Sequence, residues 1–177
     1  MRTRCLLVVA ATGLLTPGLS TPASAGTTAA TAATVIVQGG VLSITVRDDA
    51  GNLGTRSTGE DTAKVSGPLG RVRVNDERGA AAGSSWVASA ISTPFTSPTG
   101  PAIPASAVGY TAGPIAKVGT ATYTAKDPVS LPGLTAVVVA TGITGDNSAT
   151  WNPTISVTFP DGITAGVYSA TITHSVA

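Results

Sequence analysis

The sequence predicts an all-β protein, a single-domain antiparallel β-sandwich of about eight to ten strands. Valine and threonine, which favour strands, dominate the chain together with alanine, glycine and proline. Apolar and polar residues alternate with a period of two in one short segment after another. Turn-forming residues separate these segments, and no window shows the 3.6-residue apolar stripe of a helix. Short strands with frequent turns are typical of a sandwich.

The predicted strands follow one another along the chain, and most of them have one apolar face. The apolar faces of four strands are Leu42-Ile44-Val46, Ala121-Tyr123-Ala125, Ile155-Val157-Phe159 and Tyr168-Ala170-Ile172. A continuous apolar run over Thr135–Ile143 predicts a central strand. Turns are predicted at Asp48–Asn52, Asn75–Gly83, Asp127-Pro128, Leu131–Gly133, Gly145–Asn147 and Pro160–Gly162.

Residues 1–25 have the features of a secretory signal. Arg2 and Arg4 precede a short apolar run, Leu6–Leu15, and Ala23-Ser24-Ala25 provides the small residues that signal peptidase accepts. The apolar run is about half of the ~20 residues that a membrane-spanning helix needs. We therefore predict a secreted protein without a membrane span. Residues 26–34 are predicted to form a low-complexity tether, and residues 35–177 the sandwich domain.

Charge and cysteine content exclude several function classes. Once Arg2 and Arg4 are removed with the signal, eight basic residues remain beside nine acidic ones. Nucleic-acid binding relies on clustered Lys and Arg, so no nucleic-acid partner is expected. The only cysteine, Cys5, lies in the predicted signal. A disulfide scaffold, thiol catalysis and thiolate metal sites are therefore excluded.

The sequence does not predict an enzyme, a cofactor or a metal site. A Ser-His-Asp site needs a histidine held by a carboxylate, but the single histidine is His174, near the end of the chain. No G-x-S-x-G motif and no pair of zinc-binding histidines is present. The acidic clusters Asp48-Asp49, Glu60-Asp61 and Asp161-Gly162 fit ordinary turns, which we favour over calcium loops.

The stretch Val74–Ala90, VNDERGAAAGSSWVASA, predicts a hairpin. In the first strand, Asp76 continues the inward row of valines, and Arg78 or backbone amides are expected to pair with its carboxylate. Gly79–Ser84 is the predicted connection, and Ser85–Ile91 the returning strand. We predict that Asp76, Arg78 and Gly79 form a structural corner.

Four residues are candidates for ligand binding, namely Trp86, Trp151, Tyr168 and His174. Tryptophan offers a large rigid face and an N–H donor, so Trp86 or Trp151 could be a stacking platform. Both tryptophans also fit a core position, since each is in phase with apolar neighbours. His174 continues the apolar face that begins at Tyr168, where a packed or hydrogen-bonded histidine is the alternative to a ligand contact.

Two patterns support a family resemblance. Val74–Gly79 reads V-x-D-x-R-G ahead of a tryptophan strand, and Pro160–Thr173 reads P-x-G-x-x-A-G-x-Y-x-A-T-I-T. Together they resemble the WxL domain of Gram-positive surface proteins, in particular its small single-domain secreted relatives in actinobacteria. The two Trp-x-Leu motifs of that family fall on Trp86-Val87-Ala88, with Ala in place of Leu, and on His174-Ser175-Val176, with His in place of Trp.

The resemblance implies a non-enzymatic function at the cell surface. Proteins of this family attach non-covalently to the cell wall, so peptidoglycan or another wall polymer is the implied partner. The alternative is a structural coat or matrix protein that assembles with itself or with another surface protein, because Thr/Val-rich strands with exposed edges can add a neighbour's strand.

Overall fold

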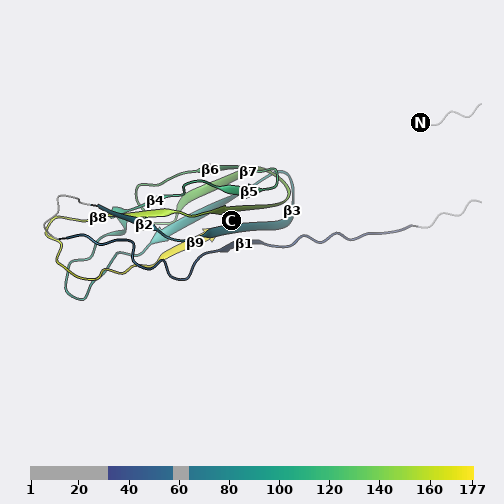
Figure 1. Ribbon diagram of the computed structural model, residues 1–177. Helices are drawn as coiled ribbons and strands as arrows, with labels where there is room; N and C mark the ends of the chain where they lie inside the picture. Colours follow the sequence, from purple (N-terminus) through teal and green to yellow (C-terminus); the bar gives the residue numbers. More distant parts are fainter. Residues whose placement is uncertain (1–31, 58–63) are drawn as a thin grey trace, which may run out of the picture. The chain divides into compact units, whose positions relative to one another are not determined.

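A ribbon of two long antiparallel strands, β3 (Val72–Ser92) and β7 (Thr135–Trp151), forms the centre of the fold. The computed structural model describes residues 32–57 and 64–177 of the chain (Figure 1). The ladder runs from Val72 opposite Trp151 to Ala90 opposite Thr135. The apolar run Thr135–Ile143 lies in β7, and β7 pairs with three other strands, which makes it the central strand that the sequence predicts.

Four shorter strands complete a six-stranded sheet around this ribbon. They are β1 (Leu42–Thr45), β5 (Ala116–Val118), β6 (Thr122–Ala125) and β9 (Ile172–Val176). β1 pairs with the first half of β3 and β9 with its second half. In the same way, β6 pairs with the first half of β7 and β5 with its second half. Each half of the ribbon is therefore flanked by its own pair of short strands.

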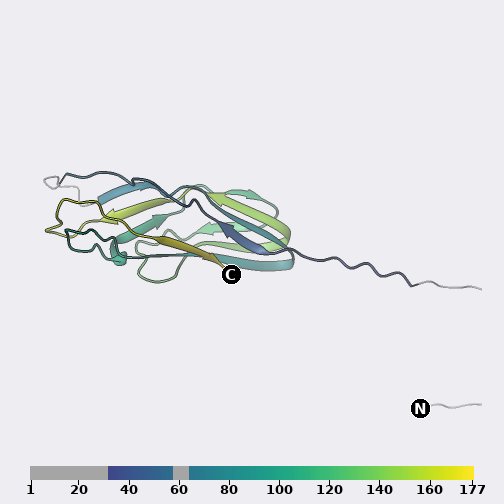
Figure 2. The same cartoon turned by 90° about the horizontal axis from the view of Figure 1, so that it is seen from below.

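The ribbon bends in the middle, so that one sheet supplies two layers. Gly79, Gly83, Gly142 and Gly145 all adopt positive φ, and the register between β3 and β7 shifts at this level. Glycine permits this backbone without strain, and bulges of this kind bend and twist paired strands together. Figures 1 and 2 show both strands curving round at one end of the ribbon. The hydroxyl of Tyr123 on β6 donates to the carbonyl of Ser148 in the other half of β7 (3.3 Å) and joins the two layers.

The other end of the ribbon continues into a second, three-stranded sheet. Its strands are β2 (Lys64–Pro68), β4 (Val108–Thr111) and β8 (Thr154–Thr158), with β8 in the centre. β2 leads into β3 and β8 follows β7, so the same two chain segments stay paired across both sheets. Pro153 has no N–H to donate and lies at the junction, where its carbonyl accepts from the N–H of Leu69 (2.8 Å).

The predicted fold class is confirmed. The described residues form nine strands in antiparallel pairs and one short 3-10 turn, Ala105–Ala107, and all the strands lie within the compact unit Val37–Ala177. The period-two pattern also predicts which side chains are buried. Val72, Val74 and Asp76 are buried in the first half of β3, and Trp86, Ala88 and Ala90 in the second.

Three local predictions are wrong. The turn predicted at Asn75–Gly83, with Gly79–Ser84 as a hairpin connection, is not present, because β3 runs without interruption from Val72 to Ser92. Gly145–Asn147 is not a turn, because it lies inside β7 opposite the bend in β3. The glycines in both stretches form bulges in paired strands rather than chain reversals. Tyr168 lies before its predicted strand, which begins only at Ile172.

The predicted secretory signal (1–25), residues 26–31 of the predicted tether and the Glu60-Asp61 turn lie outside the described residues. Residues 32–34 of the tether have no regular secondary structure. Within the described ranges, no helix has the length and apolar character needed to cross a bilayer.

Candidate functional site

A cleft of about 970 Å³ opens at the end of the ribbon that carries the three-stranded sheet. One wall is the segment Val46–Ser57, which follows β1, and the other is Ile163–Ile172, which leads into β9. The larger aliphatic and phenylalanine side chains of the lining are Val46, Leu53, Val65, Leu69, Val72, Phe95, Ile103, Val157, Phe159, Ile163, Val167 and Ile172. Here loops, rather than strands, face the inner side of β2 and β8.

Side-chain turns shape the first wall, which packs against β2. The carboxylate of Asp49 accepts the N–H of Gly51 (2.8 Å), and the side-chain oxygen of Asn52 accepts the N–H of Gly54 (3.0 Å). Both are the local turns that Asp and Asn form with backbone two residues on. Gly67 of β2 lies so close to Leu53 that there is no room for a Cβ at this position. The loop therefore rests directly on the backbone of β2.

Tyr168 stands on the second wall. Its side chain is half-buried, and its hydroxyl donates to the carbonyl of Thr164 (3.1 Å). Gly100 packs against this hydroxyl, where a Cβ would clash. Both contacts fix the phenol while part of the side chain stays open to the cleft.

The cleft also carries guanidinium groups. Arg47 and Arg71 belong to its lining and are exposed, and Arg56 lies 5.3 Å from the centre of the Phe159 ring. A guanidinium over an aromatic face is a favourable cation–π arrangement. The cleft therefore combines an apolar floor with three guanidinium groups and with the carboxylates of Asp48 and Asp49.

His174 connects the cleft to the core through two side chains. The indole N–H of Trp151 donates to the hydroxyl of Tyr110 (2.8 Å), which lies 3.2 Å from Nε2 of His174. Because indole can only donate, the hydroxyl hydrogen of Tyr110 is left for Nε2. This favours the neutral imidazole with its proton on Nδ1. Burial lowers the pKa of His174 to about 4, in agreement with a neutral ring.

Nδ1 of His174 is buried and has no hydrogen-bond partner among the described residues. His174 itself belongs to the lining of the cleft. A buried donor without a partner costs free energy, and an acceptor that reached it would recover that cost.

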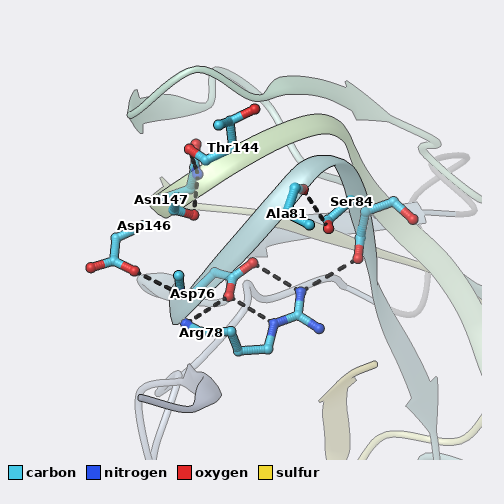
Figure 3. Close-up of polar contacts among 10 residues, drawn as sticks. Asp76, Arg78, Ala81, Ser84, Thr144, Asp146 and Asn147 are labelled. Carbon is cyan, nitrogen blue, oxygen red and sulfur yellow. Dashed lines mark hydrogen bonds and ion pairs between the residues drawn. The ribbon is translucent and has the colours of Figure 1, made fainter. Parts of the chain in front are cut away.

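The bend at the other end of the ribbon holds the predicted corner residues (Figure 3). Asp76 is fully buried and accepts from Nε and an Nη of Arg78 at 2.8 and 2.9 Å, and its Oδ1 also accepts the backbone N–H of Arg78 at 3.3 Å. These bonds, led by the side-chain pair, hold the pKa of Asp76 below its usual value. The N–H of Gly79 donates to Asp146 (3.0 Å) across the ribbon.

Buried Asn147 stabilises the same bend from β7. Its side-chain oxygen accepts the N–H of Ala121 (3.1 Å), and its amide group donates to the carbonyl of Gly145 (3.0 Å). The corner is therefore closed by partnered polar groups and offers no open site. The guanidinium of Arg78 reaches Asp76 from the surface, since its side chain is 37% exposed.

The structure separates the four candidate residues into two pairs. Trp86 and Trp151 are 1% and 2% exposed and pack in the core, so neither offers a face to a ligand. The ring of Trp86 lies 5.6 Å from that of Tyr123. Tyr168 and His174, by contrast, both line the cleft.

The first wall of the cleft, Val46–Ser57, was not identified from the sequence as part of a site. The only prediction for this segment is the turn Asp48–Asn52. Turn residues predict the local backbone geometry, but they do not predict which part of the fold the loop packs against.

The two segments that align with the Trp-x-Leu motifs are neighbours in the fold. Ala88 of β3 lies opposite Val176 of β9, and Ala90 lies opposite His174. Val87 and Ala177 exchange two backbone hydrogen bonds, of 2.8 and 3.1 Å. The two segments therefore form one paired stretch of sheet.

Comparisons of the chain with protein-family models, curated proteins and solved structures found no match. The resemblance to the WxL domain therefore stays a prediction. No group of three or more His, Cys, Asp or Glu side chains gathers at metal-binding distance within the described ranges.

Proposed function

We propose that this chain is a secreted, non-enzymatic surface protein that associates non-covalently with the Gram-positive cell wall. In this proposal the cleft holds an extended stretch of peptidoglycan or of another wall polymer. The observation that carries the proposal is the cleft itself, an opening of about 970 Å³ between two loop walls and a sheet. This is near the upper end of the ~300–1,000 Å³ that is common for ligand sites, so it has room for several units of a polymer.

The groups around the cleft suit a polymer of sugars and short peptides. Tyr168 can pack against the apolar face of a sugar ring, in the way that aromatic side chains bury large flat surfaces. Arg47 and Arg71 can pair with peptide carboxylates.

A sedimentation experiment with purified peptidoglycan sacculi tests the proposal. Residues 26–177 are incubated with sacculi at moderate salt and centrifuged, and we expect the protein in the pellet. Val167 lines the cleft and is 81% exposed, so Val167→Asp should weaken binding without unfolding the protein. Val129 is 89% exposed and lies outside the cleft lining, so Val129→Asp is the matched control. Protein left wholly in the supernatant would contradict the proposal.

A second candidate function is a coat or matrix protein that assembles with itself. One observation favours it. Val37 and Val41 are β-branched residues that are 90% and 66% exposed just ahead of the edge strand β1. Exposed strand-forming segments beside a sheet edge are sites where another chain can pair.

A further inference from the structure

The strand β1 forms a free edge of the six-stranded sheet. Among the described strands it pairs with β3 alone (Figure 1). The N–H of Glu77 donates to the carbonyl of Val41 (3.1 Å), so the residues of β1 that hydrogen-bond to β3 are those in phase with Val41. The backbone N–H and C=O groups of Leu42 and Ile44 point the other way and have no partner among the described residues. These groups are available to another strand.

Charge or proline protects three of the other edge strands. β2 begins at Lys64 and ends at Pro68, β5 contains Lys117, and β6 is followed directly by Lys126. Such residues hinder pairing with a further strand. Residues 37–46, which include β1, contain no charged side chain and no proline. The edge of β1 therefore lacks the usual protection.

The strand β1 also differs from the edge strands β4 and β9. At β4, the N–H of Tyr110 donates to the carbonyl of Pro128 (2.9 Å), so a loop already occupies part of that edge. β9 contains no Lys, Arg, Asp or Glu, but it has no exposed large apolar side chain either. β1, in contrast, lies between Val41 and Val46, which are 66% and 44% exposed. Exposed apolar surface beside unpaired backbone favours a protein partner.

We propose that β1 pairs antiparallel with β1 of a second copy, about a two-fold axis at Ser43. In this register, Leu42 of each copy lies opposite Ile44 of the other. Each copy supplies two free N–H and two free C=O groups, which together form four hydrogen bonds between the chains. Because both copies use the same surface, the contact is closed and yields a dimer.

The side chains of β1 match those of a second copy. Leu42 and Ile44 are half-buried and pack against the core, so each covers the open side of the other across the axis. On the outer face, Ser43 lies opposite the second copy's Ser43, and Val41 lies opposite Thr45, which makes a pair of β-branched residues. Self-pairing brings like residues together, so a charged edge repels its own copy. β1 brings no charge to the contact, and this favours a second copy as its partner.

Single cysteines test the pairing and its register, since residues 26–177 contain none. Opposite residues that do not hydrogen-bond to each other have Cα atoms ~4.5 Å apart, within the range of a disulfide. Ser43→Cys should therefore form a disulfide-linked dimer when oxidised glutathione is added. Val41→Cys should not, because its two thiols lie four residues, or ~13 Å, apart along the paired strands. A mixture of Val41→Cys and Thr45→Cys should cross-link, since these positions face each other.

Light scattering and a control on another strand complete the test. We expect the molar mass of wild type to rise with concentration from one chain to two and no further. Thr122→Cys, at an exposed position of β6, measures cross-linking by random collision. A wild type that stays at the mass of one chain at every concentration would overturn the proposal. So would a Ser43→Cys variant that cross-links no faster than Thr122→Cys or Val41→Cys.

A charge at the axis separates this contact from wall binding. Ser43→Lys puts two ammonium groups opposite each other and should weaken dimerisation about fivefold, whereas Thr122→Lys should not. Ser43 is not part of the cleft lining, so Ser43→Lys should sediment with sacculi like wild type. If wild type sediments but never dimerises, only the β1 contact is refuted. If wild type dimerises as expected but never sediments, only the wall-binding function is refuted.

Discussion

The two ends of the β3–β7 ribbon differ in how their space is filled. At the bend, the ribbon turns back on itself, and Asp76, Asp146 and Asn147 all find partners nearby. At the cleft, the ribbon continues into a sheet whose strands β2 and β8 face the two loop walls, and Nδ1 of His174 has no partner among the described residues. A sheet that covers itself leaves no opening, whereas loops leave a cavity. The candidate site therefore lies where the sandwich is incomplete.

The largest expected difference between the two ends concerns the aromatic side chains. Trp86→Ala should lower the free energy of unfolding by ~3–5 kcal/mol, because it removes a fully buried side chain from the core. Tyr168→Ala, at the half-buried wall of the cleft, should cost only ~1 kcal/mol. Urea unfolding followed by circular dichroism measures both values. Equal losses would mean that the wall of the cleft is as tightly packed as the core.

The pH dependence of stability tests the histidine at the open end. The pKa of His174 in the folded protein is about 4, below its usual 6.5. As the pH falls, the imidazole is therefore protonated in the unfolded chain before it is protonated in the folded protein. Stability is fully present above pH 6.5 and falls as the pH drops toward 4, by about 1 kcal/mol per pH unit and ~3 kcal/mol in total. His174→Gln, which keeps an acceptor for Tyr110, should remove most of this slope between pH 6.5 and 4.5.

His174 is the only histidine of the chain, so no other imidazole contributes in this range. Asp76 acts at lower pH, because its folded pKa lies below the usual 3.8. Its contribution is present above about pH 4 and is lost on further acidification. A slope between pH 6.5 and 4.5 that survives in His174→Gln would show that the imidazole does not titrate as a buried group.

The smallest expected effect concerns the glycines of the bend. Gly79 has φ of +61° and open space where a Cβ would be, so Gly79→Ala adds backbone strain and no clash. We expect a loss of ~1 kcal/mol. Gly133 also has open space but no positive φ, so Gly133→Ala should be neutral or stabilising by up to ~1 kcal/mol. Similar values for both in thermal unfolding would show that the bend does not depend on left-handed backbone.

The alternation of apolar and polar residues predicts the strands, and the place of each residue in that alternation predicts whether its side chain is buried. Val72, Val74 and Trp86 are buried as the alternation requires, because a side chain's face depends only on its position in the strand. The same residues could not distinguish a hairpin from a bend. Glycine serves both a turn and a bulge, and the choice at Gly79 depends on β7, which is distant in sequence.

The candidate site was harder to predict than the fold. Tyr168 and His174 could be placed on one apolar face, but their phase is compatible with a core and with a cleft. The position of the loop Val46–Ser57 decides that these two side chains line a cleft and not a closed core. That position follows from contacts such as that of Leu53 with Gly67. Those contacts join segments with no shared sequence pattern.

The pairing of β3 with β7 also has a consequence for how the chain folds. Paired residues of the two strands lie between 45 and 79 positions apart in sequence, so we expect their ladder to form late and folding to be slow. At a synthesis rate of ~5–20 residues per second, β7 is completed several seconds after β3. An unpaired strand of 21 residues is prone to aggregate, but Asp76, Glu77 and Arg78 interrupt it with charge. The residues that close the bend in the folded protein thus protect the same strand before it is paired.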